Sequence, residues 1–294
     1  MKTVIEKANG KINLYLDVLG KREDGYHNIL SVMHTVSLHD TVTVTEVEPE
    51  GAGVTMSCTD LTLSCGEDNL CLKAARVYLK ALSAESDVKT PSYRIHLEKH
   101  LPREAGLGGG SADAAAVLRA MNRLCGNRYS EEKLCELGAG IGADVPFCVV
   151  GGAYIAEGIG ERLSPHPTLP SCYLIICEGE GKMSTPTAYR MLDQTPSDSK
   201  KPLAALTEAM TAGRLSAIGE ALYNRFEDIV PKAKQTRKIL LDAGAVGARM
   251  TGSGTAVYGL FEQREEAEKA LAVLLDKGRR AFLAVPTEKE NFDE

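Results

Sequence analysis

A run of glycines leads directly into an alanine-rich segment, and the residue types of this stretch suit phosphate binding. Residues 101–121 read LPREAGLGGGSADAAAVLRAM. The glycines at 106–110 can adopt positive φ and expose backbone N–H groups with no Cβ in the way, and Ser111 is a residue type typical of a helix N-cap. The N–H groups and the positive dipole end at the start of a helix attract polyphosphates. The stretch therefore predicts a phosphate-binding loop followed by a helix.

The same stretch differs from three better-known nucleotide motifs. A P-loop requires GxxxxGK followed by Ser or Thr, and no lysine follows these glycines. A dinucleotide fingerprint would place a further glycine at position 111, where Ser111 stands. The chain also contains no HRD or DFG, which protein kinases require. For the stretch taken alone, a glycine-rich turn before a core helix remains the alternative interpretation.

Two charged residues and a second glycine turn could complete a phosphoryl-transfer site. Asp144 is the single carboxylate of the segment GIGADVP at 140–146, where it could accept a hydroxyl proton or orient the attacking hydroxyl. Phosphoryl transfer also requires positive charge near the transferring group, and Lys11 is the candidate. The turn TGSGT at 251–255 could bring backbone close to a ligand. Taken singly, Asp144 could equally be a turn or capping residue and Lys11 a solvated strand lysine.

The segment that contains Lys11 alternates strictly between apolar and polar residues. Such alternation predicts a half-buried strand over Lys11–Val18. One face would carry Ile12, Leu14, Leu16 and Val18, and the other Lys11, Asn13, Tyr15 and Asp17. Lys11 and Asn13 should therefore lie side by side on the polar face.

The remaining elements follow from periodicity, caps and glycine stops. Residues 138–158 read as a glycine-rich loop that leads into a strand, and residues 249–261 as a loop followed by a strand. Further strands are expected at 41–47, 93–97, 172–177 and 280–285, and helices at 69–82, 111–124, 130–138, before Gly244 and at 264–277. This order fits an α+β sandwich with helices on one face of a mostly antiparallel sheet. The proline-rich segment 163–171 suggests two domains, 1–163 and 164–294.

Composition narrows the class of protein further. The net charge is −6 with no Lys/Arg-rich run, so nucleic acid or an anionic membrane surface is not expected as a partner. The N-terminus lacks a signal-peptide core, and no apolar run approaches the roughly 20 residues that span a bilayer. We therefore expect a cytoplasmic protein. The eight cysteines form no CxxC pair and are expected to be buried reduced thiols.

Four segments together resemble a known family. GKINLYLDVLGKREDGYH, LPREAGLGGGSADAAAVL, IGADVPFCVVGGAYIAEGIGE and TGSGTAVYGLF are similar, in order and spacing, to the GHMP superfamily of galactokinases, homoserine kinases, mevalonate kinases and phosphomevalonate kinases. The combination of KINLYL, DGYH and GADVPF resembles the members that phosphorylate a cytidine-linked alcohol. The resemblance implies a two-domain α+β fold, with a ribosomal-S5-like N-terminal domain, a ferredoxin-like C-terminal domain and the substrate cleft between them.

The resemblance also implies a reaction and residue roles. ATP, the co-substrate, would donate its γ-phosphoryl group to the 2-hydroxyl of a cytidine-diphosphate-linked methylerythritol, with Asp144 as base and Lys11 as its cationic partner. The substrate would contact Asn13, Tyr26, His27, Thr185 and Tyr189. ATP would contact Asn69, near the adenine, and the loop residues Pro102, Arg103, Glu104, Ala105, Gly106, Leu107, Gly108, Gly109, Gly110, Ser111 and Ala112. Mg²⁺ is expected, but its protein ligands cannot be identified from the sequence, and Ser111 is one candidate.

Departures from the family pattern leave alternatives open. Gly10 stands where proline or alanine is common, and Ala112 where many members carry a second serine, which leaves ATP affinity and loop closure open. A kinase of another small alcohol, such as homoserine or mevalonate, would have no use for DGYH and Tyr189. A non-catalytic nucleotide or metabolite sensor would have no need for both Lys11 and Asp144. The sequence makes no prediction of oligomeric state.

Overall fold

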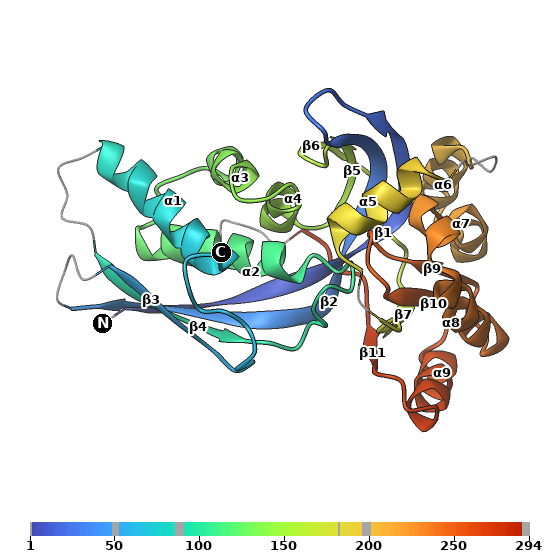
Figure 1. Ribbon diagram of the computed structural model, residues 1–294. Helices are drawn as coiled ribbons and strands as arrows, with labels where there is room; N and C mark the ends of the chain where they lie inside the picture. Colours follow the sequence, from blue (N-terminus) through green and yellow to red (C-terminus); the bar gives the residue numbers. More distant parts are fainter. Residues whose placement is uncertain (1, 49–52, 86–90, 182, 196–200, 290–294) are drawn as a thin grey trace.

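Two long antiparallel strands, β1 (Thr3–Lys21) and β2 (His27–Val47), run through the centre of the molecule (Figure 1). The computed structural model describes residues 2–48, 53–85, 91–181, 183–195 and 201–289. Within these, the first sheet has the order β3-β4-β2-β1-β8, and β5 pairs with both β2 and β6. The strands added to β1 and β2 are β3 (Val54–Cys58), β4 (Ser92–Glu98), β5 (Ala153–Gly158), β6 (Arg162–Pro165) and β8 (Tyr223–Asn224).

Four helices cover one face of this sheet (Figure 1). They are α1 (Leu70–Glu85), α2 (Gly109–Leu124), α3 (Glu131–Ala139) and α4 (Val145–Val150). The alanine-rich face of α2 packs closely on β1 and β2 because alanine side chains allow the helix to approach the sheet. The expected strands at 41–47 and 93–97 and the expected helices at 69–82 and 130–138 are confirmed within one to three residues, except that the first strand is the end of the longer β2.

A second, antiparallel sheet has the order β11-β7-β10-β9 within the described residues. Its strands are β7 (Tyr173–Cys177), β9 (Gly247–Met250), β10 (Val257–Phe261) and β11 (Ala281–Ala284). The associated helices are α5 (Thr185–Asp193), α6 (Leu203–Thr211), α7 (Leu215–Ala221), the 3₁₀ helix η1 (Arg225–Ile229), α8 (Pro231–Asp242) and α9 (Arg264–Asp276). The boundary expected between residues 163 and 164 falls inside β6 and remains a prediction.

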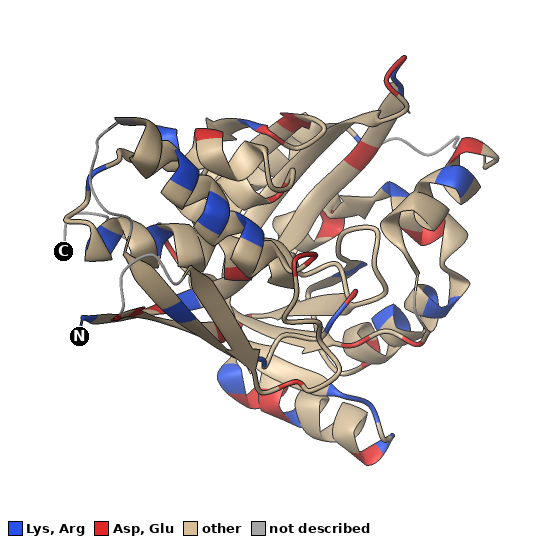
Figure 2. Cartoon of the chain, turned by 60° about the vertical axis from the view of Figure 1, so that its left-hand side comes forward, with Lys and Arg blue, Asp and Glu red and all other residues tan. Residues whose placement is uncertain are grey.

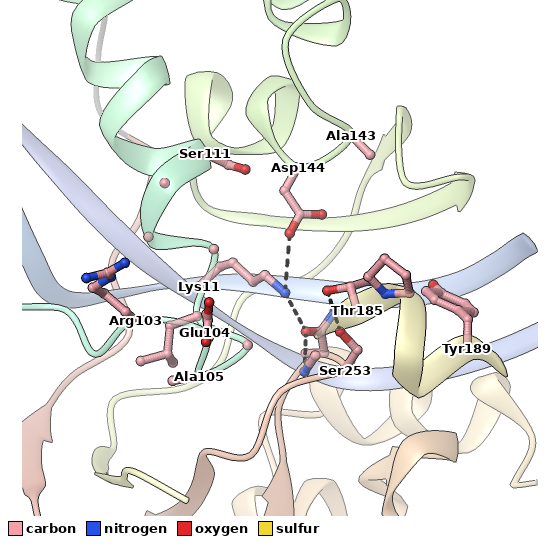
Figure 3. A pocket seen from close by; sticks show the side chains of 18 of the residues that line it. Lys11, Arg103, Glu104, Ala105, Ser111, Ala143, Asp144, Thr185, Tyr189 and Ser253 are labelled. Carbon is pink, nitrogen blue, oxygen red and sulfur yellow. Dashed lines mark hydrogen bonds and ion pairs between the residues drawn. The ribbon is translucent and has the colours of Figure 1, made fainter. Parts of the chain in front are cut away.

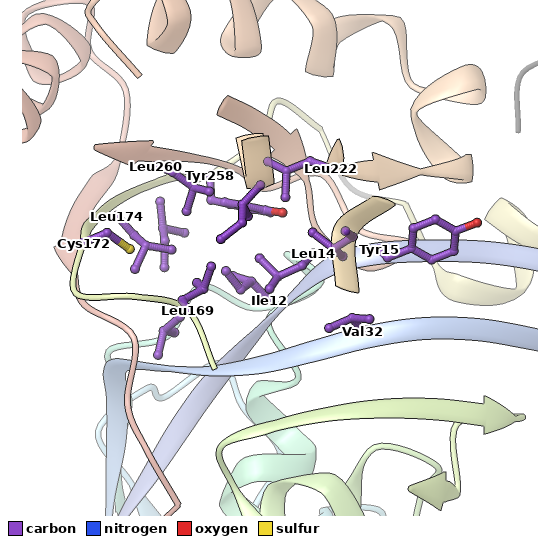
Figure 4. Close-up of a cluster of buried hydrophobic side chains, with 14 of the residues drawn as sticks. Ile12, Leu14, Tyr15, Val32, Leu169, Cys172, Leu174, Leu222, Tyr258 and Leu260 are labelled. Atoms are coloured by element: carbon purple, nitrogen blue, oxygen red, sulfur yellow. The ribbon is translucent and has the colours of Figure 1, made fainter. Parts of the chain in front are cut away.

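An apolar cluster joins β1 to the second sheet (Figure 4). Ile12 and Leu14 of β1 pack with Leu174 of β7 and with Tyr258 and Leu260 of β10. All five side chains are fully buried, and burial of such side chains stabilises a fold by about 1.5–3 kcal/mol each. The strand that carries Lys11 is therefore held by the second sheet as well as by its own.

A strand is present over residues 11–18, but the expectation that it is only half-buried is wrong. Residues 11–17 are buried on both faces, because α2 and α4 cover one side of β1 and the second sheet covers the other. The strict alternation also fails, since a register shift lies between Asn13 and Tyr15. Tyr15 therefore joins Leu14 in the apolar cluster instead of sharing a face with Lys11.

Three local expectations also require correction. Residues 145–150 form α4 within the segment expected to be a loop leading into a strand, and Pro146 stands in the first turn where proline is tolerated. Residues 249 and 250 belong to β9, so the expected loop is confined to residues 251–256, and the expected strand is β10. Ser111 is not the N-cap of α2: the helix begins at Gly109, and Gly108 caps it with φ of 69°. The glycines thus continue into the first helical turn.

In Figure 2 acidic and basic residues are interspersed over the helices on the side shown. No helix of the described ranges has the length and apolar character needed to cross a bilayer. The eight cysteines, all within the described residues, are free, and three of them are buried. The other five are half-buried, so the expectation of buried thiols is confirmed only for Cys71, Cys172 and Cys177.

A buried histidine between the two halves predicts an acid-sensitive fold. His34 Nε2 accepts a hydrogen bond of 3.1 Å from the Leu169 N–H, so Nδ1 carries the proton and donates to Thr35 O at 2.8 Å. Burial, with a smaller effect of His166, lowers the pKa of His34 to about 4. The neutral ring is therefore favoured by folding, and its contribution is present above pH 6.5 and lost as pH falls from 6.5 to 4. The total loss amounts to about 3 kcal/mol.

We expect His34→Gln, which keeps one donor and one acceptor, to remove this part of the pH dependence. Urea unfolding of the wild type and of His34→Gln at pH 7.5 and 4.5 measures the change in the free energy of unfolding between the two pH values. Carboxylates that titrate in the same range contribute equally to both proteins, so the difference between the proteins reports His34. An unchanged difference between the two pH values in His34→Gln would contradict the assignment.

Candidate active site

A pocket of about 1030 Å³ lies where the glycine loop, β1, α4, α5 and the β9–β10 turn meet (Figure 3). Nearly all the residues selected from the sequence line it: Lys11, Asn13, Tyr26, His27, Asn69, residues 102–111, Asp144, Thr185 and Tyr189. Ala112 does not line it, because the side chain is 2% exposed and packs in the apolar cluster under α2. The expected contact between Ala112 and ATP remains a prediction, whereas the other eighteen residues share one cavity.

The glycine loop presents the start of α2 to the pocket. Ala112 N bonds to Gly108 O at 2.8 Å, so the intrahelical ladder begins there. The N–H groups of residues 109–111 precede that bond and have no intrahelical partner. These groups and the positive end of the helix dipole can bind phosphate oxygens.

Gly106 serves the contact between the loop and the β9–β10 turn. Its φ is +82°, and a Cβ placed on it would lie 2.1 Å from Thr251 O. A Cβ on Gly252 would lie 2.9 Å from Gly106 Cα, and one on Gly254 would lie 2.3 Å from Gly106 N. Three glycines therefore let two backbone segments from different halves of the chain pack directly against each other.

Lys11 and Asp144 meet at the middle of the pocket (Figure 3). Their Nζ and Oδ2 atoms are 3.6 Å apart, with side-chain exposures of 5% and 30%. Asp144 occupies the N-cap position of α4, but its side chain makes no capping hydrogen bond. The carboxylate therefore faces the pocket, and the lysine below it passes so close to Gly108 that a Cβ there would lie 3.1 Å from Lys11 Cγ.

Asn13 joins Lys11 to the second half of the chain. Its Oδ1 accepts hydrogen bonds from Lys11 Nζ at 2.8 Å, from Gly252 N at 2.9 Å and from Thr251 Oγ1 at 3.2 Å. Its Nδ2 donates to Ser31 Oγ at 2.8 Å. The side-chain oxygen of Asn13 thus already accepts three hydrogen bonds. A substrate hydroxyl would meet the remaining N–H of the side-chain amide.

Aromatic rings and a histidine form one end of the pocket. His27 and Tyr189 are stacked, with centroids 4.7 Å apart and an interplanar angle of 22°, and Phe226 meets Tyr189 at 90°. Tyr26 is 61% exposed at the rim. A base therefore cannot lie between His27 and Tyr189 unless they separate, whereas Tyr26 is free to cover a base from the solvent side. Thr185, at the start of α5, is joined to Ser253 of the turn by a 3.0 Å hydrogen bond.

The opposite end of the pocket lies at the start of α1. Asn69 Oδ1 accepts from Cys71 N at 2.9 Å and its Nδ2 donates to Ser64 O at 2.6 Å, so it shapes the loop before the helix. Arg103 of the glycine loop donates to Thr62 Oγ1 at 2.8 Å. The loop that precedes α1 and the glycine loop are thereby joined.

The sequence analysis missed a buried ionic cluster under the glycine loop. Lys99 Nζ contacts Asp113 Oδ2 at 2.9 Å and also Asp40, and all three side chains are at most 8% exposed. Burial and the neighbouring Asp40 raise the pKa of Asp113, although Lys99 lowers it. A charged residue between alanines in SADAAA was the available signal for it.

Oxygen donors for a metal are few. Among the described residues no group of three or more His, Cys, Asp and Glu side chains is placed to hold a metal ion. Ser111 offers a hydroxyl at the first turn of α2, on the pocket side (Figure 3). Such a site suits Mg²⁺, which usually keeps several waters and binds through substrate phosphates.

Comparison with known proteins identifies relatives over the whole chain. The model of the GHMP kinases N terminal domain matches residues 69–152, and that of the GHMP kinases C terminal domain matches residues 206–280. A curated relative from Caldicellulosiruptor saccharolyticus, named 4-diphosphocytidyl-2-C-methyl-D-erythritol kinase, is 37% identical over 293 residues, which are 98% of this chain and 99% of the relative.

Solved structures agree with these matches. A crystal structure of 4-(cytidine 5'-diphospho)-2C-methyl-D-erythritol kinase superposes with a TM-score of 0.79 at 33% identity, covering 96% of this chain and 99% of the other. Homoserine kinase from Cytophaga hutchinsonii superposes with a TM-score of 0.77 at 20% identity, covering 99% and 97%. The second likeness concerns the fold alone.

Proposed function

We propose, because this chain belongs to the GHMP kinases and within them to the 4-diphosphocytidyl-2-C-methyl-D-erythritol kinase family, that it transfers the γ-phosphoryl group of ATP to the 2-hydroxyl of that cytidine-linked alcohol. The reaction would serve the non-mevalonate synthesis of isoprenoid precursors. The observation that carries the proposal is the order of groups along one pocket: a phosphate-binding turn, then Lys11 and Asp144, then the aromatic end.

Asp144 is proposed as the residue that receives the hydroxyl proton. Its carboxylate faces the pocket without a capping role, and Lys11 Nζ lies 3.6 Å away. A carboxylate at this position can orient the hydroxyl toward the γ-phosphorus and take up its proton as the O–P bond forms. Lys11 would stabilise the negative charge that spreads over the transferring group, and Asn13 keeps its ammonium in place through the 2.8 Å bond.

The substrate and ATP would occupy opposite ends of the pocket. Tyr26, His27 and Tyr189 would bind the cytosine, with Thr185 and Asn13 nearer the methylerythritol. ATP would lie along the glycine loop with its adenine toward Asn69. This arrangement brings the acceptor hydroxyl and the γ-phosphate together at Asp144, which is the geometry that in-line transfer requires.

Mg²⁺ is proposed to accompany ATP. Ser111 would be its protein ligand, together with phosphate oxygens and water. When bound, the ion neutralises phosphate charge, while the residues of this chain position the hydroxyl and receive its proton.

Release of ADP by purified protein tests the proposal. With ATP and Mg²⁺ we expect turnover of 4-diphosphocytidyl-2-C-methyl-D-erythritol at least about a hundredfold faster than that of homoserine or mevalonate, because neither of these can fill the aromatic end. Turnover of an acceptor without cytidine would favour another small-alcohol kinase. Stabilisation by ATP against heat without ADP release from any acceptor would favour a sensor.

A further inference from the structure

The imidazole of His27 is fixed by a carboxylate that the sequence analysis did not single out. Asp193, the last residue of α5, places Oδ1 2.7 Å from His27 Nε2. Tyr189, one turn earlier on α5, stacks on the same ring. The His27 side chain is 7% exposed, so the ring is held on one face and at one edge.

The carboxylate determines which ring nitrogen carries the proton. The hydrogen bond with His27 is the largest cause that holds the pKa of Asp193 below its ordinary value, and Lys21 Nζ, 3.4 Å from Asp193 Oδ2, acts in the same direction. An ionised carboxylate can only accept hydrogen bonds, so Nε2 must donate. In a neutral imidazole whose Nε2 bears the proton, Nδ1 is an acceptor.

An acceptor at this position distinguishes pyrimidines. Cytosine carries an amino group at position 4, which donates hydrogen bonds, whereas uracil carries a carbonyl oxygen there, which accepts them. Nδ1 is the remaining polar atom that the His27 ring can offer to a ligand in the pocket that it lines. The amino group can pair with it, while the carbonyl would leave two acceptors facing each other.

We propose that Asp193 is a specificity-determining positioning residue, which selects cytidine over uridine in the substrate by holding His27 in the tautomer with an acceptor at Nδ1. The inference rests on the proposed function. Asp193 itself acts through His27 and does not touch the reacting atoms.

The substitution Asp193→Asn should reverse this selection. Lys21 favours the oxygen of the introduced amide on its own side, so the amide NH₂ turns toward His27. Nε2 of His27 then accepts a hydrogen bond from this NH₂, and the ring proton moves to Nδ1. We expect kcat/KM for the cytidine substrate to fall about 30-fold, mainly through KM, since the cytosine amino group would lose its acceptor. The cytidine-to-uridine ratio of kcat/KM should fall at least as much, and kcat at saturation should change by less than about threefold. The matched control is Glu23→Gln, which removes one negative charge from the exposed turn before His27 and should keep the wild-type ratio.

The ring protons of His27 provide a readout that does not depend on turnover. In protein labelled with ¹⁵N-histidine, with His27 assigned by its loss in His27→Phe, we expect a proton on Nε2 in the wild type and on Nδ1 in Asp193→Asn. A wild-type ratio in Asp193→Asn, or a wild-type His27 with its proton on Nδ1 or on both nitrogens, would overturn the proposal. If wild-type protein turns over no cytidine substrate, the proposed function fails, and the ¹⁵N spectrum still decides whether Asp193 fixes the tautomer.

Discussion

Asp144→Asn is expected to lower kcat about a thousandfold while the Kd for ATP changes by less than about threefold. The amide has the shape of the carboxylate, but it cannot take up the hydroxyl proton, and a positioned base typically contributes 10²–10⁴-fold. ATP binding should persist because the phosphate-binding turn at residues 108–111 does not depend on this side chain. Steady-state ADP release gives kcat, and calorimetry with a non-hydrolysable ATP analogue gives the Kd.

The control for this experiment is Glu157→Gln, which removes one negative charge from an exposed position of β5. It should keep wild-type turnover. Turnover near the wild-type rate in Asp144→Asn would remove the proposed base from its role. A loss of ATP binding of the same size as the loss of kcat would assign Asp144 to nucleotide binding instead.

Gly106→Ala is the second substitution with a large expected effect. The residue has φ of +82°, and the added Cβ would lie 2.1 Å from Thr251 O and 3.2 Å from Gly254 N. Both contacts are with backbone, so the glycine loop and the β9–β10 turn would have to separate. We expect a loss of about 3 kcal/mol in the free energy of unfolding, from positive φ and steric overlap together. We also expect kcat/KM for ATP to fall at least a hundredfold, because the turn also holds Asn13.

Gly110→Ala serves as the stability control for Gly106→Ala. A Cβ at Gly110 would meet only Leu70 Cδ1, at 3.5 Å, and the residue lies inside α2 with an ordinary φ. Its stability should stay equal or rise by up to about 1 kcal/mol, because alanine has the higher helix propensity. Urea unfolding compares the two variants with the wild type. Equal stability of both variants would show that the two loops do not depend on the close approach at Gly106.

The candidate site could be selected from the sequence to a large extent, because its residues lie in short segments with distinctive composition. The strand segment with Lys11, the glycine loop, GADVPF and DGYH each carry local signals, and eighteen of the nineteen site residues named in the sequence analysis line one pocket. Ala112 was the exception, since a small apolar residue in a loop-to-helix stretch fits a core contact as well as a ligand contact. Asp193 carried no signal, because nothing in the local sequence of α5 relates it to His27.

The secondary-structure elements also divide into those with a local sequence signal and those without one. Helices and strands with regular periodicity, such as α1, α3 and β4, were predicted because hydrophobic spacing is a local property. The short helix α4 was missed because six residues with a proline and three valines give no helical period. The burial of the polar face of β1 was missed because alternation indicates which residues share a face but not what covers that face.

The family resemblance, the order of the main elements and the candidate residues for the chemistry could be predicted from residue types and short spacings. The packing of the folded chain sets the 3.6 Å separation of Lys11 and Asp144, the contact of Gly106 with the β9–β10 turn and the hydrogen bond between Asp193 and His27. Each of these contacts joins segments that are far apart in the chain, so no local pattern predicts it. Their distance is set by the packing of two sheets and their helices around shared cores, and that packing depends on all the apolar side chains together.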